Sequence, residues 1–265
     1  MRITALVENT TARAECTAEH GLALLVEANG RTVLFDSGQG AETLVANAAA
    51  LGIDLASVEA AVLSHGHHDH SGGFNAFLDA NDTAVVYGRK GCELPHFHGE
   101  KYIGIDAQLA SNPRFHLLEG DFDLGHGFSI VSFAAEEPVV PIDSDNLEEE
   151  DHDGRHLEQF THEQCLIVEE GASRVLISGC SHRGIVNYAH WTRELGITHF
   201  VGGFHLMRLP LESDRIAATA EALLAFPARY TTCHCTGSAQ HRLLKRVMGD
   251  RLGYLSTGET LEIVE

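Results

Sequence analysis

The segment Ser-His-Gly-His-His-Asp-His-Ser-Gly-Gly at residues 64–73 constrains this chain more than any other feature. Four histidines and one aspartate fall within six positions, between a largely apolar run and a glycine pair. Without a bound cation, protonation of any two of these imidazoles would make them repel each other. A divalent ion removes that difficulty, because neutral imidazoles and a carboxylate all act as its ligands. The segment therefore predicts a metal site.

The local geometry predicts two ions rather than one. In an extended chain, residues two apart project to the same side, so His65 and His67 are expected to bind one ion while the next histidine points away. The chain is then expected to turn into a helix that begins near Ser71, which aims Asp69 and His70 at a second position. We therefore expect two bound ions about 3.5 to 4 Å apart. Because two ions need more ligands than this segment holds, distant residues must contribute.

Hydrophobic periodicity along the chain predicts strands that alternate with helices, and therefore an α/β fold. Strands are expected at 21–28, 31–38, 58–65, 84–88, 128–133, 164–170, 174–180, 198–205, 228–235 and 260–265. Helices are expected at 40–51, 72–79, 184–195, 213–226 and 238–248. We expect one domain over residues 1–265, with an irregular insert at about 89–160 that covers the site as a lid.

Several of the most apolar strands end on an acidic side chain or one able to bind a metal. These side chains are Asp36, His65, Cys180, His205 and His234. Where helices cover a sheet, the strand ends open onto a crevice in which polar groups from distant positions meet, so we expect these five to form one rim. Asp36 is expected to accept a hydrogen bond from a ligand histidine, with a turn-forming aspartate as the alternative. His205 is either functional or a core histidine held by hydrogen bonds.

Two choices of ligand stay open at this point. Cys180 and His182 compete for one position, because both lie at the polar end of the strand 174–180. Cys233 and Cys235 alternate with His234, so that either the imidazole or the pair of thiols faces the metals, and we favour the imidazole.

Composition excludes several classes of partner. The formal net charge of −20, from 18 basic and 38 acidic residues, argues against nucleic acid. No apolar stretch approaches the roughly 18 to 20 residues that span a bilayer, and the first residues lack a signal-peptide pattern, so we expect a cytoplasmic protein. The six cysteines are expected to be thiols. The acidic stretch 143–153 is expected to be a solvated loop.

The run His-Gly-His-His-Asp-His at 65–70 fits the HxHxDH signature of the metallo-β-lactamase superfamily, which this chain resembles. The motifs LFDSG, SHGHHDHSGG, HEQCL, SGCSHRGIVN, GGFHL and CHCTG resemble more closely its subgroup of dihydropterin ribofuranosylaminobenzene phosphate synthase-like metal-dependent hydrolases. The resemblance implies an αβ/βα sandwich of two mixed sheets flanked by helices, with the metal site at one edge between the sheets.

The same resemblance implies a ligand set. By this match His162 completes the first site with His65 and His67. His234 joins Asp69 and His70 at the second site. Cys180 stands where many members carry a bridging aspartate.

Two closely spaced dications lower the pKa of a shared water from 15.7 toward about 7 and act as Lewis acids. The chain is therefore expected to be a hydrolase with a metal-activated hydroxide as nucleophile, oriented by Asp69. The subgroup resemblance implies a small phosphorylated or pterin-like substrate, and group transfer as well as hydrolysis. Arg183 or Lys101 is expected to receive a phosphate. A Cys180 thiolate would favour zinc over manganese or iron.

Two other functions remain open from the sequence. One is a diiron redox or oxygen-handling protein on the same fold, and the other is a metal-binding module without turnover. The oligomeric state is open as well, a homo-oligomer included.

Overall fold

Two seven-stranded sheets and a four-stranded sheet are present in the computed structural model, which describes residues 1–264. The first sheet has the order β18-β1-β2-β3-β4-β5-β8, the second β17-β16-β15-β14-β13-β10-β9, and the small sheet β12-β11-β6-β7. The strands of the first sheet are β1 (Arg2–Val7), β2 (Ala23–Ala28), β3 (Arg31–Phe35), β4 (Ala60–Val62), β5 (Val86–Arg89), β8 (Phe115–Leu118) and β18 (Thr260–Glu262). Those of the second are β9 (Phe122–Gly125), β10 (Phe128–Val131), β13 (Cys165–Glu170), β14 (Ser173–Ile177), β15 (His199–Gly202), β16 (Arg229–Thr232) and β17 (Leu252–Tyr254). Those of the small sheet are β6 (His96–His98), β7 (Lys101–Tyr102), β11 (Leu147–Asp151) and β12 (Gly154–Leu157).

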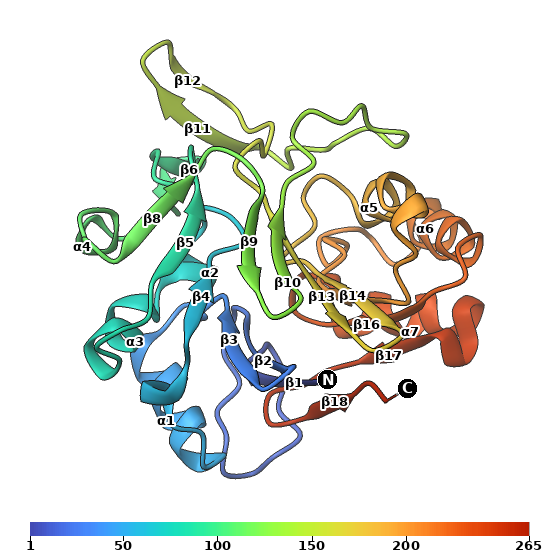
Figure 1. The fold of residues 1–265 in the computed structure, drawn as a ribbon. Helices are drawn as coiled ribbons and strands as arrows, with labels where there is room; N and C mark the ends of the chain where they lie inside the picture. The colour runs from blue at the N-terminus through green and yellow to red at the C-terminus, as the bar shows by residue number, and fades with distance from the viewer. Residues whose placement is uncertain (265) are drawn as a thin grey trace.

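Helices cover the outer face of each large sheet (Figure 1). The α-helices are α1 (Ala41–Ala50), α2 (His68–Ser71), α3 (Phe74–Ala80), α4 (Ala107–Ala110), α5 (Ile185–Trp191), α6 (Asp214–Leu224) and α7 (Ser238–Met248), and 3₁₀ helices lie at Leu55–Ser57, Arg193–Leu195, His234–Thr236 and Gly249–Arg251. Apolar residues of α1 and α3 pack on the first sheet, and those of α5, α6 and α7 pack on the second. The expected αβ/βα sandwich is confirmed.

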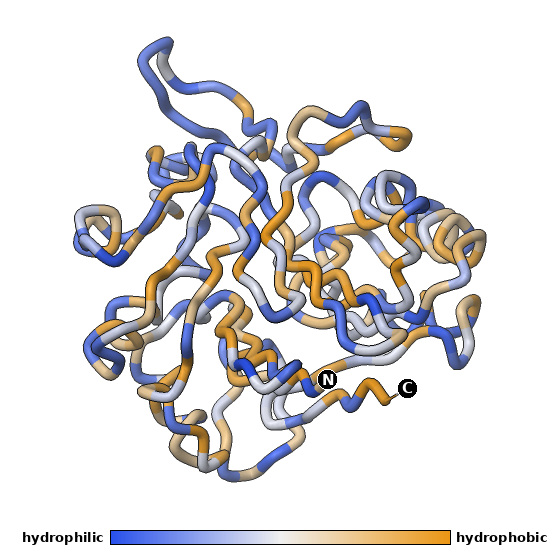
Figure 2. The backbone as a smooth tube through the Cα atoms, viewed as in Figure 1, coloured by the Kyte–Doolittle hydropathy of each residue, from blue (hydrophilic) through white to orange (hydrophobic). Residues whose placement is uncertain are grey.

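The central strands are apolar on both faces because both faces are buried. In β2, Leu24 and Val26 belong to the core between the two sheets, whereas Ala23 and Leu25 belong to the core under α1 and α3. Strands covered on both sides lack the polar alternation of a half-exposed sheet. Figure 2 shows the resulting concentration of hydrophobic residues in the sheets.

Parallel strands bring the candidate residues to one edge of the sandwich. The run β3-β4-β5-β8 is parallel in the first sheet, and β14-β15-β16-β17 is parallel in the second. Their carboxyl ends therefore open toward the same side of each sheet, where a crevice forms. The five predicted rim residues all follow the ends of these strands.

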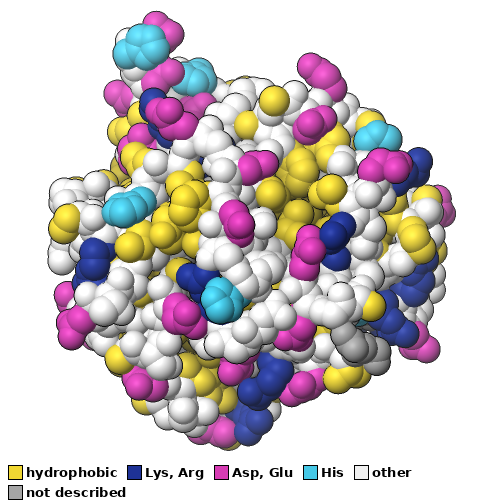
Figure 3. Space-filling model, in the orientation of Figure 1, with side chains coloured by type: hydrophobic (Ala, Val, Ile, Leu, Met, Phe, Trp, Pro, Cys, Tyr) yellow, Lys and Arg dark blue, Asp and Glu magenta, His cyan; other side chains and the backbone are white. Residues whose placement is uncertain are grey.

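The prediction of an irregular segment at 89–160 is wrong in its local structure. This segment contains β8, β9 and β10, which extend the two large sheets, and all four strands of the small sheet. Much of the acidic stretch 143–153 lies in the hairpin of β11 and β12 rather than in a loop. That hairpin projects from the sandwich (Figure 1) and carries acidic and histidine side chains (Figure 3).

The other predicted elements agree with the structure. Each predicted strand range overlaps an observed strand, and each predicted helix range overlaps an observed helix. β1 and β17 were not predicted. Within the described residues, the helices are too short or too polar to cross a membrane. All six cysteines are free thiols, as predicted.

Candidate metal centre

The histidine-rich segment is held between two loops of the first sheet. Its helix α2 begins at His68, earlier than the predicted start near Ser71, so Asp69 and His70 lie on the helix itself. The amide of Leu22 donates to the carbonyl of Asp69, and the amide of Ser37 donates to that of His70. These contacts fix the direction in which the Asp69 and His70 side chains leave the backbone.

Gly72, at the end of α2, is where the segment passes closest to its neighbours. A Cβ atom at this position would lie 1.9 Å from the carbonyl oxygen of Gln39, which is backbone and cannot move aside cheaply. We therefore expect Gly72→Ala to lower the free energy of unfolding by about 3 kcal/mol, measured by denaturant titration of the metal-free protein. Gly120→Ala is the matched control, because a Cβ there meets nothing within 4 Å. Equal stability of the two variants would contradict this account.

The first group of candidate ligands is His65, His67 and His182, whose donor atoms lie within 4.8 Å of one another. The Ser64 hydroxyl donates to Asp36 at 2.8 Å and lies 2.8 Å from Nδ1 of His65. Since its proton is committed to the carboxylate, the hydroxyl accepts from His65 Nδ1–H. Nε2 of His65 is then a bare lone pair, and it is buried without a protein partner.

Both ring nitrogens of His182 are likewise buried without a partner. Burial, together with neighbouring imidazoles, lowers the pKa of His65 and of His182 well below the usual value for histidine. Both are therefore neutral, which is the form that binds a metal.

Hydrogen bonds also fix the tautomers of His70 and His234. Nδ1 of His70 lies 2.7 Å from a carboxylate oxygen of Asp36, which can only accept. Nδ1 of His234 lies 2.8 Å from Oδ1 of Asn9, and the amide of Gly21 donates to that same oxygen and so identifies it as an acceptor. Both imidazoles consequently carry their proton on Nδ1 and have a free lone pair on Nε2.

These lone pairs converge on the carboxylate of Asp69, which forms the second group. Oδ2 of Asp69 lies 3.4 Å from Nε2 of His234 and 3.8 Å from Nε2 of His70. Nε2 of His20 lies 3.2 Å from the same oxygen. Two bare nitrogens and an anionic oxygen are mutually repulsive unless a proton or a metal cation lies among them. The donor set fits a divalent ion.

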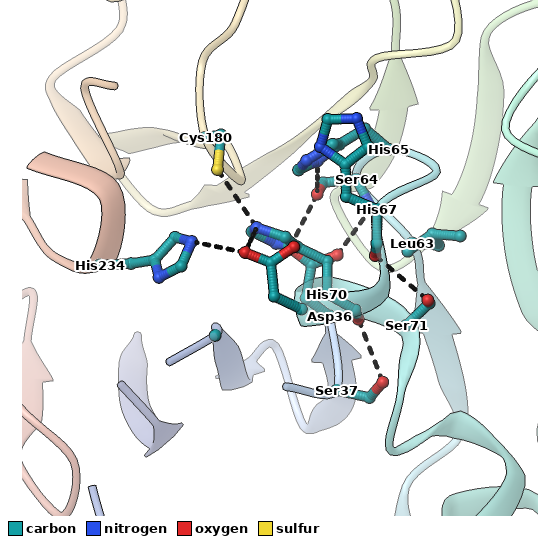
Figure 4. Close-up of polar contacts among 12 residues, drawn as sticks. Asp36, Ser37, Leu63, Ser64, His65, His67, His70, Ser71, Cys180 and His234 are labelled. Carbon is teal, nitrogen blue, oxygen red and sulfur yellow. Dashed lines mark hydrogen bonds and ion pairs between the residues drawn. The ribbon is translucent and has the colours of Figure 1, made fainter. Parts of the chain in front are cut away.

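Figure 4 shows how the two groups meet. His65, His67 and His70 come from the end of β4 and from α2, whereas Cys180 and His234 approach from the second sheet. Sγ of Cys180 lies 3.2 Å from Nε2 of His70. Asp36 accepts directly from His70 and, through Ser64, orients His65, which is the role predicted for it.

His162 lies farther from His65 and His67 than the resemblance implied. Its ring centroid is 6.5 Å from that of His65 and 6.3 Å from that of His67, whereas the ring of His182 lies at 4.8 and 5.0 Å. Nδ1 of His162 accepts from the amide of Gly66, and its Nε2 lies 3.4 Å from Glu158. The geometry favours His182 over His162 as the third imidazole of the first group.

Glu158 is fully buried and is surrounded by three imidazoles. Its carboxylate lies 3.0 Å from Nε2 of His67, 3.0 Å from Nδ1 of His96 and 3.4 Å from Nε2 of His162. Although burial by itself raises the pKa of Glu158, these imidazoles lower it well below the usual value. The carboxylate therefore accepts from His67 Nε2–H, which leaves Nδ1 of His67 free to bind a metal.

We expect Glu158→Gln to weaken metal binding by about 10- to 100-fold, because the amide no longer fixes the tautomer of His67. The measurement is competition for Zn²⁺ with a chromophoric chelator. Glu148→Gln, which removes a partly exposed ion pair with Arg155 in the same segment, is the control and should leave the affinity unchanged. Identical affinities in the two variants would contradict the role given to Glu158.

The alternation expected around His234 does not hold. His234 has a positive φ of 47° and begins a 3₁₀ helix, so the strand geometry ends before it. Cys233 packs in the core between the sheets, whereas His234 and Cys235 both line the cleft. The imidazole that we favoured does line the cleft, and one of the two thiols lines it as well. The two alternatives drawn from the sequence did not include this combination.

Arg183 is not available to a substrate phosphate. Its guanidinium is buried and donates to the carbonyl oxygens of Gln159, Ala134 and Glu136. Lys101 does line the cleft, as expected for a residue that contacts substrate.

The cleft has a volume of about 720 Å³ and opens above both groups of candidate ligands. The first group, the second group and the small sheet all contribute to its walls. The lining residues are His20, Gln39, His67, His68, Asp69, His98, Lys101, Ile103, Leu147, Cys180, His182, His205, Met207, Arg208, His234 and Cys235.

Comparison with known families decides which fold family this is. The family model described as the metallo-beta-lactamase superfamily matches residues 16–227, most of the chain. The chain belongs to the metallo-beta-lactamase superfamily. This confirms the family expected from the motifs.

Individual known proteins align along nearly the whole chain. The 7,8-dihydropterin-6-methyl-4-(beta-D-ribofuranosyl)-aminobenzene-5'-phosphate synthase of Methanocaldococcus jannaschii is 25% identical, covering 92% of this chain and 90% of its own. The structure of Tm1679, a metal-dependent hydrolase of the beta-lactamase superfamily, aligns with a TM-score of 0.83 and 29% identity over 100% of both chains. Zn²⁺-bound PqqB from Methylobacterium extorquens shares the fold, with a TM-score of 0.62 and 12% identity, covering 99% of this chain and 100% of its own.

Several residues of this metallo-beta-lactamase site were missed or given no definite role from the sequence. His20 and Glu158 stand outside any recognisable motif, and Arg208 follows the predicted strand 198–205 by only three residues. His96 lies in the segment that was expected to be irregular, yet it is fully buried against Glu158. The one signal in the sequence that could have drawn attention to His96 is the second histidine two residues later, at His98.

Proposed function

We propose that the chain is a metal-dependent hydrolase or group-transfer enzyme with a two-metal centre that acts on a small anionic molecule. The supporting observation is that bare imidazole nitrogens and the Asp69 carboxylate converge in one cleft, in two adjacent groups. The ions, when bound, lower the pKa of water and polarise the substrate oxygen that gains charge. Zinc is the metal we favour, because the donors are imidazoles, a carboxylate and a thiol.

The residues around Asp69 are placed to handle a proton. Oδ2 of Asp69 faces the cleft, and we assign it the role of accepting a hydrogen bond from the attacking water. His20 lies 3.2 Å from this oxygen, and its side chain is half exposed at the cleft. It is therefore positioned to pass a proton between Asp69 and solvent.

The walls of the cleft favour an anionic substrate. Lys101, His98 and Arg208 line one side, and Arg208 is held 3.1 Å from Asp145. The name of the similar synthase of Methanocaldococcus jannaschii includes a phosphate, which agrees with a phosphorylated substrate. Because Lys101 and Leu147 belong to the small sheet, we propose that this sheet, within the segment 89–160, acts as a lid over the bound molecule.

The test is turnover of a panel of phosphomonoesters, phosphodiesters and lactones by protein purified without chelator. We expect activity that is lost on chelation, restored by Zn²⁺ or Mn²⁺, and absent from the His67→Ala variant. Hydrolysis that survives chelation and this substitution would overturn the proposal.

Two other outcomes distinguish the remaining functions. Iron content with visible absorption would identify a diiron redox protein. Tight metal binding with no turnover on the whole panel would identify a metal-binding module.

A further inference from the structure

Cys180, His205 and Cys235 form a third group of donors in the cleft, and its members lie within 4.8 Å of one another. They follow the carboxyl ends of β14, β15 and β16, three adjacent parallel strands of the second sheet. We propose that these three side chains form an additional, sulfur-rich metal site, which adjoins the imidazole centre through Cys180 and takes a soft or borderline ion such as Cu⁺ or Zn²⁺. The site does not depend on the proposed hydrolase activity.

The backbone around this group is held in place from both sides. The amides of Leu206 and Met207 both donate to the carbonyl of Cys235, at 3.0 and 2.9 Å. The amide of Gly203 donates to the carbonyl of Gly179 at 2.8 Å. These bonds tie together the three loops that carry the donors, so the donors are preorganised rather than brought together by the ion.

Gly203 permits this close approach. A Cβ atom there would lie 2.3 Å from Sγ of Cys235 and 3.0 Å from the carbonyl oxygen of Gly179. His205 has a left-handed backbone, with φ of 50°. Conformations of this kind cost of order 1–3 kcal/mol and persist where the surrounding structure imposes them, which is common at functional sites.

The donors themselves are short of protein partners. Both ring nitrogens of His205 are buried without a hydrogen bond, and the nearest carboxylate oxygen, on Asp145, lies 3.7 Å from Nε2. Sγ of Cys235 contacts the backbone amide of His205 at 3.3 Å and the carbonyl of Cys180 at 3.4 Å. Sulfur hydrogen bonds of this length are weak, so an ion can replace them at little cost.

The chemistry of the donors sets the choice of ion. Two thiols and one imidazole match soft or borderline ions, whereas Mg²⁺ and Mn²⁺ prefer oxygen. This set shares only Cys180 with the imidazole and carboxylate groups, through its contact with His70. The three residues all line the cleft, so an ion can enter from solvent. A position is left for a fourth ligand from water or substrate.

The test uses the full-length, metal-free protein titrated with Co²⁺, whose thiolate complexes give a near-ultraviolet charge-transfer band. We expect this band in the wild-type protein. In Cys235→Ser, we expect the number of bound ions per chain to fall by about one and the band to fall to about half its wild-type intensity. His205→Ala is expected to weaken Co²⁺ binding at this site by more than about 100-fold, beyond the loss from an outer-sphere partner.

Two control variants separate this proposal from the proposed function. Cys233→Ala removes a neighbouring thiol that faces the core and should leave band and metal count unchanged. His67→Ala should reduce metal bound at the imidazole centre but keep the thiolate band.

An unchanged band and metal count in Cys235→Ser would overturn the sulfur-rich site, since the sulfur signal would then belong to Cys180 at the imidazole centre. The sulfur-rich site would also be overturned if protein purified under reducing conditions held Cys180 and Cys235 as a disulfide that binds no metal.

Discussion

Replacing His182 with alanine is expected to weaken binding of the first metal ion far more than replacing His162. The donor atoms of His182 lie within 4.8 Å of those of His65 and His67, so its loss removes one of three ligands. His162 contacts Gly66 and Glu158 instead, and the loss of such an outer-sphere contact costs about 10- to 100-fold in affinity. The His182→Ala effect should exceed that range. Equilibrium dialysis of Zn²⁺ against a competing chelator measures both.

The two variants form a matched pair, because each removes one fully or nearly fully buried imidazole from the same site. Denaturant unfolding of each metal-free variant checks that both remain folded. A larger loss of affinity in His162→Ala than in His182→Ala would show that the ligand set implied by the motif resemblance, and not the one favoured by the geometry, binds the ion.

Asp36→Ala is expected to have the largest effect on stability. The carboxylate is fully buried and accepts from the backbone amide of Ser64, the Ser64 hydroxyl and Nδ1 of His70. Each of these three buried donors left without a partner costs about 1–3 kcal/mol, so the total loss is about 3–9 kcal/mol. That is a large share of the roughly 5–15 kcal/mol that stabilise a typical domain. Denaturant titration of the metal-free protein measures the change.

The control is Asp54→Ala, which removes an exposed cap on a 3₁₀ helix and should cost about 1 kcal/mol. A loss at Asp36 no greater than this would contradict the account.

Asp36→Asn separates stability from metal binding. Asparagine tolerates the positive φ of 58° at this position and can still accept from the Ser64 amide. Its NH₂ group, however, forces His70 to carry its proton on Nε2, the nitrogen that faces Asp69 and Cys180. We expect most of the stability to remain and the metal affinity to fall by about 10- to 100-fold. An affinity equal to that of the wild type would show that the tautomer of His70 does not matter.

The local sequence was sufficient for most of the fold and for part of the centre. The strands and helices were predicted because their hydrophobic periods are set by neighbouring residues. His65, His67, Asp69 and His70 were predicted together for the same reason, since their relative positions depend on a few dihedral angles within one short segment. The small sheet within the segment 89–160 was not predicted, because its strands are short and mostly polar and β6 pairs with β11, which is distant in the sequence.

The sequence by itself determined the family, the layered fold and the presence of a histidine-rich segment, because each depends on the local spacing of residues. Only the tertiary structure placed His182 nearer than His162 to His65 and His67, made Glu158 a partner of His67, and brought Cys235 into the cleft beside His234. Ser181, His205 and His234 all have left-handed backbones that contacts between loops impose. The direction of a side chain at such a position depends on those distant contacts, and residue alternation along the chain does not encode it.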